Sequence, residues 1–263
     1  MMARQFSFPR LLVNLFCLLL AAVLLAGCGS TAASPVSSAA STAAESTTSS
    51  VVSETTSAAA DENVAAAAQL LNDLTGSYQE LWPVILADEY KQTWLDDCTA
   101  LVGEENAEAA FEKLSSMVTS DVYGEDAVEA YANGGGAYFC GFTNSLATLT
   151  FDGETSTISG TDKDGNVLFS HTYHYIGMEP VHGLYEFESD DADSGEFTYF
   201  FLAPDTSAET YHIEFRYGSD AEALSQYDAG EYAYWVASGI STDCDQTMID
   251  NCIELFCTEN LAG

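Results

Sequence analysis

The segment 146–175, LATLTFDGETSTISGTDKDGNVLFSHTYHY, decides the fold of this chain. It holds three short runs rich in β-branched and aromatic residues, which Asp152-Gly153 and Asp164-Gly165 separate. An Asp-Gly pair between such runs is a strong signal for a β-hairpin. The segment therefore predicts three antiparallel strands that follow one another directly along the chain.

Runs of the same kind continue beyond this segment, at residues 184–188, 197–202 and 209–217. Six or seven short strands in hairpin succession predict an antiparallel barrel or sandwich. Helical periodicity on either side makes the fold class α+β. The expected helical stretches are 62–74, 78–95 with a break at Trp82-Pro83, 104–117, 126–132, 221–224 and 243–257, the last capped by Thr242 and Asp245.

The first 28 residues have the pattern of a bacterial lipoprotein signal. Two arginines precede an apolar run at 11–25, and Leu25-Ala26-Gly27-Cys28 closes it with small residues before a cysteine. The run is short for a transmembrane helix, which needs about 20 residues. We therefore expect a signal peptide at 1–27, lipidation of Cys28, and an extracytoplasmic protein that is lipid-anchored to the bacterial cell membrane.

A Ser/Thr/Ala-rich tract follows the expected lipidation site. It has no aromatic residue before residue 60, so it cannot bury enough apolar surface to offset its ordering entropy. We expect residues 28–60 to form a lipidated cysteine and a disordered linker, and residues 61–263 to form the folded domain.

The charge of the chain is strongly negative. It has 41 acidic and 6 basic residues, and removal of the two arginines in the signal takes the net charge from −35 to −37. Such a surface repels nucleic acid and attracts cations diffusely. A nucleic-acid partner is therefore excluded, while the acidity alone indicates no specific cation site.

Five cysteines remain after the signal and Cys28: Cys98, Cys140, Cys244, Cys252 and Cys257. None forms a C-x-x-C pair, so zinc-ribbon and thioredoxin-type sites have no support. Cys244 and Cys252 lie about 12 Å apart if they share one helix, which is too far for a disulfide. A bridge from the last helix to Cys98 or to Cys140 is the better hypothesis.

Seven segments in order resemble the ZinT (YodA) family. The most specific is ETYHIEFRYG at 209–218 with SDAEAL at 219–224, which is similar to the family's His-x-His strand and following helix start. The resemblance covers roughly residues 74–261. The other segments are LTGSYQELWP (74–83), LTFDG (149–153), YHYIG (173–177), LYEFE (184–188), TYFFLAP (198–204) and the final helix.

The resemblance implies a lipocalin-like (calycin) β-barrel with flanking α-helices. It also implies extracytoplasmic binding of zinc, and possibly of cadmium, by three histidines at one barrel opening, in metal acquisition or homeostasis with a metal transporter as a possible partner. His212 matches one of those histidines. The other two positions carry Thr210 and Phe200, so the family's own site is not intact.

A remodelled zinc site is the hypothesis that remains. His212 and Glu214 share one face of a strand, since alternate residues point the same way. His171 and His174 are three apart on another strand, so only one of them can join. The candidate metal ligands are therefore His212, Glu214, His174 and His171.

The sequence also bears on an acidic loop, on catalytic motifs and on an alternative function. Asp190, Asp191, Asp193 and Glu196 form an acidic loop that could hold calcium loosely, although a solvated turn is the default interpretation. No Ser-His-Asp, Walker or Rossmann pattern is present, so the chain is not expected to be an enzyme. The alternative function is a metal-free calycin-type binding module for a small apolar or peptide ligand or for a partner protein.

Overall fold

Eight antiparallel strands pair in chain order and close into a barrel, with β8 returning to β1. The structure is a computed structural model that describes residues 51–133, 136–204 and 212–262, with side chains from Glu62 onward. This up-and-down topology is that of a lipocalin-like barrel and confirms the predicted fold class. The strands are β1 (Gly76–Glu80), β2 (Thr148–Asp152), β3 (Thr157–Thr161), β4 (Val167–Met178), β5 (Tyr185–Ser189), β6 (Tyr199–Leu202), β7 (His212–Gly218) and β8 (Ala237–Ser241).

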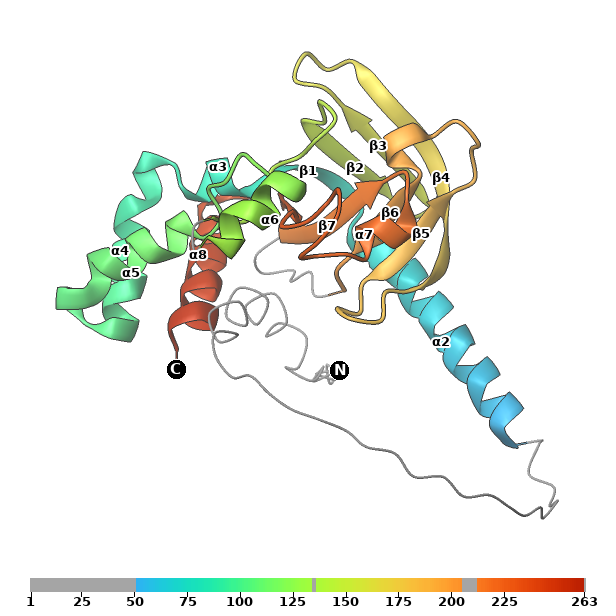
Figure 1. Cartoon of the computed structure of the whole chain (residues 1–263), viewed down its shortest axis with the longest axis horizontal. Coiled ribbons are helices and arrows are strands. Elements are labelled where there is room, and N and C mark those ends of the chain that lie inside the picture. The colour runs from blue at the N-terminus through green and yellow to red at the C-terminus, as the bar shows by residue number, and fades with distance from the viewer. Residues whose placement is uncertain (1–50, 134–135, 205–211, 263) are drawn as a thin grey trace, which may run out of the picture.

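The helices gather mainly on one side of the barrel. Figure 1 shows α3, α4, α5 and α8 together on that side, whereas α2 leaves the barrel in the opposite direction. The described helices are α2 (Val51–Asp73), α3 (Leu81–Ile85), α4 (Lys91–Val102), α5 (Glu104–Ser116), α6 (Glu125–Ala132), α7 (Ala221–Leu224) and α8 (Gln246–Leu261).

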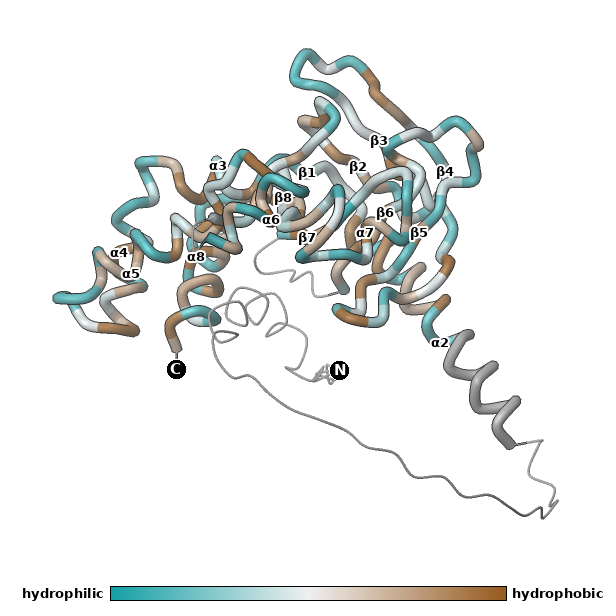
Figure 2. The backbone as a smooth tube through the Cα atoms, viewed as in Figure 1, coloured by the Kyte–Doolittle hydropathy of each residue, from teal (hydrophilic) through white to brown (hydrophobic). Residues whose placement is uncertain are grey.

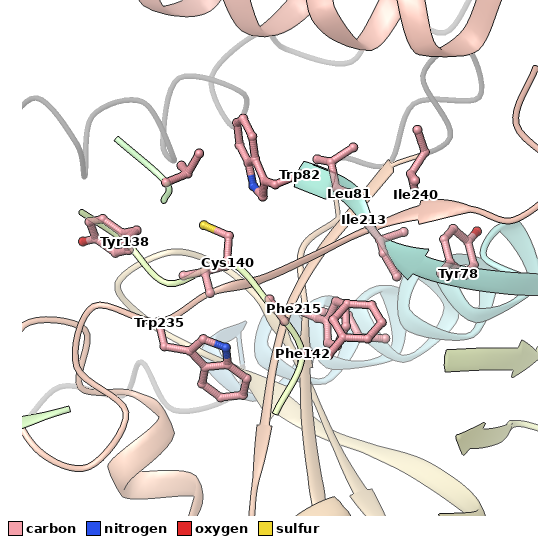
Figure 3. Packing of buried hydrophobic residues seen from close by; sticks show 14 of the residues in the cluster. Tyr78, Leu81, Trp82, Tyr138, Cys140, Phe142, Ile213, Phe215, Trp235 and Ile240 are labelled. Atoms are coloured by element: carbon pink, nitrogen blue, oxygen red, sulfur yellow. The ribbon is translucent and has the colours of Figure 1, made fainter. Parts of the chain in front are cut away.

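Aromatic side chains pack the inside of the barrel. Phe200 is fully buried, and its ring lies 5.4 Å from Tyr217 and 5.9 Å from Phe169. Phe142, from the segment before β2, lies 5.3 Å from Phe215 of β7 (Figure 3). The barrel interior described here is therefore a packed core rather than an open ligand cup.

The helical group has its own aromatic centre. Trp94 of α4 is fully buried, and its indole Nε1 donates a hydrogen bond to the carbonyl of Ile85 at 2.7 Å. Phe256 of α8 contacts both tryptophans, at 4.7 Å from Trp82 and 5.7 Å from Trp94. Figure 2 shows hydrophobic and hydrophilic residues interspersed along α4, α5 and α8. This packing holds α8 against α3 and α4.

Two strands were not predicted from the sequence. Tyr78 was expected in a helix, but it lies in β1 opposite Leu149 of β2 and Ser241 of β8. β8 carries only one large apolar residue, Ile240, and so has no strand signal of its own. Both strands form because closure of the barrel gives each of them a hydrogen-bonded neighbouring strand on both sides. This pairing outweighs the weak strand preference of their own residues.

Helix α2 begins at Val51, inside the segment predicted as a disordered linker. Its C-terminal part packs on the barrel, where Ala67, Leu70 and Leu71 are buried, as is Leu74 immediately after the helix. A packed turn removes the cost of nucleation, so the helix can extend back through good helix formers such as alanine. The predicted signal peptide, Cys28 and residues 29–50 lie outside the described residues.

The last helix begins later than expected. Its N-cap is Asp245, whose carboxylate accepts from the Met248 N–H at 3.0 Å. Asp245 alone is the N-cap residue, and the Thr242 N–H donates to the Ser77 carbonyl and extends the β8–β1 pairing. Among the helices of residues 51–262 that the structure describes, none is both long and apolar enough to cross a membrane.

Candidate metal centre

The two histidines of β4 lie on opposite faces of the barrel wall. His171 follows the inward register of Phe169 and Tyr173, with ring distances of 5.9 and 6.5 Å, and its side chain is 16% exposed. His174 points outward, and its side chain is 52% exposed. The two rings thus lie on opposite sides of the strand, as the alternation of side chains along a strand predicts.

The other two predicted ligands lie on a different part of the wall. His212 and Glu214 alternate with the buried residues Ile213 and Phe215 of β7, so they point outward. Glu214 faces the α8 side of the barrel: burial raises the pKa of the Cys252 thiol to about 12, and the Glu214 carboxylate adds to that shift. These two side chains belong to the barrel surface beside α8.

The predicted four-residue metal set is therefore not brought together. Strands β5 and β6 separate β4 from β7, which places His174 and His212 three strands apart. His171 lies on the inner face, so the wall itself separates it from His212 and Glu214. Among residues 62–133, 136–204 and 212–262, no group of three or more His, Cys, Asp or Glu side chains has the geometry to hold a metal ion.

The register also separates Phe200 from His212. Phe200 is paired with Tyr217, five residues along β7 from His212 and so about 17 Å away. It is fully buried in the aromatic core. Thr210 lies outside the described residues. A histidine at position 200 would thus point into the core of this barrel rather than toward His212.

The structure does bring together two histidine–aspartate pairs where β5 ends. The Nδ1 atom of His171 lies 2.7 Å from the Asp191 carboxylate, and the Nδ1 atom of His174 lies 2.7 Å from the Asp190 carboxylate. The Asp190 N–H donates to the Thr172 carbonyl at 2.8 Å. The acidic turn therefore straddles β4, with one carboxylate on each face of the wall.

The outer pair has a third member. The Nε2 atom of His174 lies 4.0 Å from a carboxylate oxygen of Glu188, its cross-strand partner on β5. The other oxygen of Glu188 accepts from the Tyr199 hydroxyl at 3.2 Å. A carboxylate that holds Nδ1 orients the imidazole so that Nε2 is the free ligand atom. His174, Glu188 and Asp190 can thus offer a cation one nitrogen and one oxygen directly, and water must supply the remaining ligands.

The sequence alone did not predict this arrangement, because a solvated turn was the default interpretation of the acidic loop at residues 190–196. A signal was present in two histidines three apart, followed by the adjacent aspartates Asp190 and Asp191. The hairpin register between β4 and β5, with its bulge between Tyr175 and Gly177, decides that these groups meet. A one-residue slip would exchange the two faces.

A buried carboxylate lies in the loop between β4 and β5. Glu179 is fully buried and accepts from the N–H groups of Val181 and His182 at 2.9 and 2.5 Å. The His182 ring is largely buried, with Nδ1 3.4 Å from the same carboxylate. Burial raises the pKa of Glu179, but the hydrogen bonds from His182 and Val181 outweigh it and lower that pKa below its ordinary 4.5.

Replacing Glu179 with glutamine is expected to weaken the dependence of stability on acid. A carboxyl whose pKa is lowered in the folded state stabilises the fold above about pH 4.5, and this contribution is lost as the pH falls toward the folded pKa. Urea midpoints at pH 7, 5, 4 and 3 measure the effect. The difference between wild type and Glu179→Gln should shrink from pH 5 to pH 3. The exposed Glu154→Gln serves as control, and a pH-independent difference for Glu179→Gln would contradict the assignment.

Comparisons with known proteins find distant structural similarity only. No protein-family model and no curated protein matches the chain. It is similar to the Zn(II)-bound ZinT-like domain of Streptococcus pneumoniae AdcA, with 15% identity over 68% of this chain and 87% of that one, at a TM-score of 0.43. It is also similar to Zn(II)-bound AdcA from Streptococcus pneumoniae, with 14% identity and a TM-score of 0.39, over 68% of this chain but only 33% of that one.

Proposed function

We propose that this chain is an extracytoplasmic, lipid-anchored protein that binds a divalent cation, zinc first among them, on the outer face of β4 and β5. The observation that carries this function is the orientation of His174, which Asp190 holds at Nδ1 so that Nε2 faces Glu188. We assign the chain a binding role in metal acquisition or homeostasis and no catalytic step.

The donor types of this site suit zinc. Zinc accepts imidazole nitrogen and carboxylate oxygen as ligands, and it keeps water in open positions. The strongly negative surface raises the local concentration of cations around the site. A site with two direct protein ligands binds more weakly than a closed four-ligand site, and it releases its ion more readily. That property fits a protein that collects metal for a transporter rather than storing it.

Replacing His174 with alanine is expected to weaken zinc binding about tenfold or more, because it removes the only nitrogen ligand of the proposed site. The measurement is a calorimetric zinc titration of the mature chain, repeated in excess magnesium to saturate diffuse binding to acidic groups. Glu188→Gln should weaken binding in the same direction.

His212→Ala is the matched control, since His212 lies three strands away, and it should leave the zinc affinity unchanged. Equal affinity in His174→Ala and wild type would contradict the site. The absence of zinc binding in wild type would contradict the function.

A second candidate is a metal-free module that binds a partner protein. The β4–β5 hairpin exposes three large apolar residues, with Ile176 41%, Met178 39% and Val181 65% accessible. The packed aromatic interior argues against a small apolar ligand inside the barrel. A wild-type chain without zinc affinity would leave this candidate in place, whereas binding that depends on His174 would favour the first.

A further inference from the structure

Two buried thiols meet between the helices beside the barrel. Cys98 of α4 and Cys257 of α8 are both fully buried, and their sulfur atoms lie 3.9 Å apart. Both thiols are free in this structure. The sequence pointed to a bridge from the last helix to Cys98 or Cys140, and the structure places Cys98 beside that helix.

The surrounding packing fixes the two cysteines against each other. Cys98 lies one helical turn beyond the buried Trp94, and Cys257 follows Phe256, whose ring lies 5.7 Å from that tryptophan. The α4 and α8 backbones are thus held side by side at this level. Formation of the bond requires the two sulfur atoms to approach from 3.9 Å to about 2 Å.

We propose that Cys98 and Cys257 form a structural disulfide that joins α4 to α8 when the protein folds outside the cytoplasm. The extracytoplasmic setting rests on the proposed function, whereas the pairing rests on the positions of the two sulfur atoms. The two residues are 159 positions apart, and all strands from β2 to β8 lie between them. The bond would enclose β2 to β8 in one covalent loop, while β1 lies before Cys98 and stays outside it.

The chemistry is thiol–disulfide exchange with a disulfide-bearing oxidant. The thiolate of one cysteine attacks the oxidant's disulfide and releases one oxidant thiol, and a mixed disulfide forms. The second thiolate then attacks the protein sulfur of that mixed disulfide and releases the other oxidant thiol. The two protein thiols lose two protons and two electrons, and the oxidant's disulfide becomes two thiols.

Burial sets the timing of this reaction. Burial raises the pKa of both thiols, which disfavours the thiolate that must attack. Exchange therefore takes place before α8 docks on α4, and the finished bond is shielded from reductants afterwards. Cys140, Cys244 and Cys252 stay as thiols.

The test uses the mature chain refolded with glutathione disulfide, so that it depends neither on export nor on metal binding. Free thiols are alkylated in denaturant, and the peptides are mapped by mass spectrometry without reduction. We expect one cross-linked peptide pair that contains Cys98 and Cys257. We also expect a thermal midpoint about 10 °C above that of the chain refolded with reductant.

The variants keep the result interpretable. Cys140→Ser removes another buried thiol and should retain both the cross-link and the rise in the midpoint, whereas Cys98→Ser should lose both. Reduction of the bond by dithiothreitol should be slow in the folded chain and fast in denaturant. Alkylation of both Cys98 and Cys257 in the refolded wild type, or a cross-link between other cysteines, would overturn the proposal.

Discussion

Replacing Arg216 with alanine is expected to lower the free energy of unfolding by about 3–5 kcal/mol, because it leaves buried carbonyls without a donor and opens a cavity. Arg216 lies on β7, points out of the barrel and is fully buried under the connection from β7 to β8. Its guanidinium donates to the backbone carbonyls of Leu224, Gln226 and Tyr232, and it lies 4.2 Å from the centre of the Tyr227 ring.

The size of this effect follows from what the substitution leaves behind. Three carbonyls of an irregular segment lose their donor, and each unsatisfied buried group costs about 1–3 kcal/mol. A cavity remains beside Tyr227 as well. The segment 219–236 has little regular structure of its own, so the arginine fork replaces the pairing that a strand would provide. We expect this segment to loosen before the barrel opens.

Urea unfolding followed by circular dichroism measures the loss. Lys91→Ala is the matched control: Lys91 pairs with Glu108 at 3.7 Å, and their side chains are 52% and 73% exposed, so its removal should cost less than about 1 kcal/mol. Arg216→Lys should recover only part of the lost stability. The planar guanidinium of arginine donates to all three carbonyls at once, whereas the compact ammonium group of lysine cannot reach all of them. An Arg216→Ala chain as stable as the Lys91→Ala chain would show that the segment is held in another way.

Arg216 also shows where sequence reasoning stops. The run HIEFRYG was correctly predicted as a strand, but nothing in the sequence indicates that its arginine is fully buried. The Asp-Gly hairpins around β2, β3 and β4 were predictable because turn chemistry is local. The closing strands β1 and β8 were not, since their stability comes from partners far away in the sequence.

The candidate metal site also has features that the sequence predicts and features that it does not. Alternation along a strand correctly separated His171 from His174, because it depends only on the period of a strand. The expectation that His212 and Glu214 would join one of them required the spatial order of the strands. The barrel places β5 and β6 between them, and the partners that His174 does have, Glu188 and Asp190, come from the neighbouring hairpin instead.

The junction between α2 and the barrel matters because α2 is the path from the expected anchor to the folded domain. The turn between β2 and β3 lies directly against the last turns of α2. The Gly153 N–H donates to the Thr75 hydroxyl at 3.0 Å, immediately after the helix. A Cβ atom added at Gly153 would lie 2.4 Å from the Asn72 Cα and 2.5 Å from the Leu71 carbonyl oxygen. These are backbone atoms, which cannot rotate away as a side chain can.

Replacing Gly153 with alanine is therefore expected to displace α2 from the barrel and to cost about 3 kcal/mol, the upper part of the range for overpacking. The matched control is Gly165→Ala in the β3–β4 turn. Gly165 has a φ of +81° and no neighbour within 4 Å of an added Cβ, so it should cost only about 1 kcal/mol of backbone strain. Urea midpoints measure both, and limited proteolysis should cut α2 of Gly153→Ala faster than α2 of Gly165→Ala. Equal midpoints and equal cleavage rates for the two variants would mean that α2 can move away from Gly153 without loss of stability. Helix α2 would then not be rigidly coupled to the barrel.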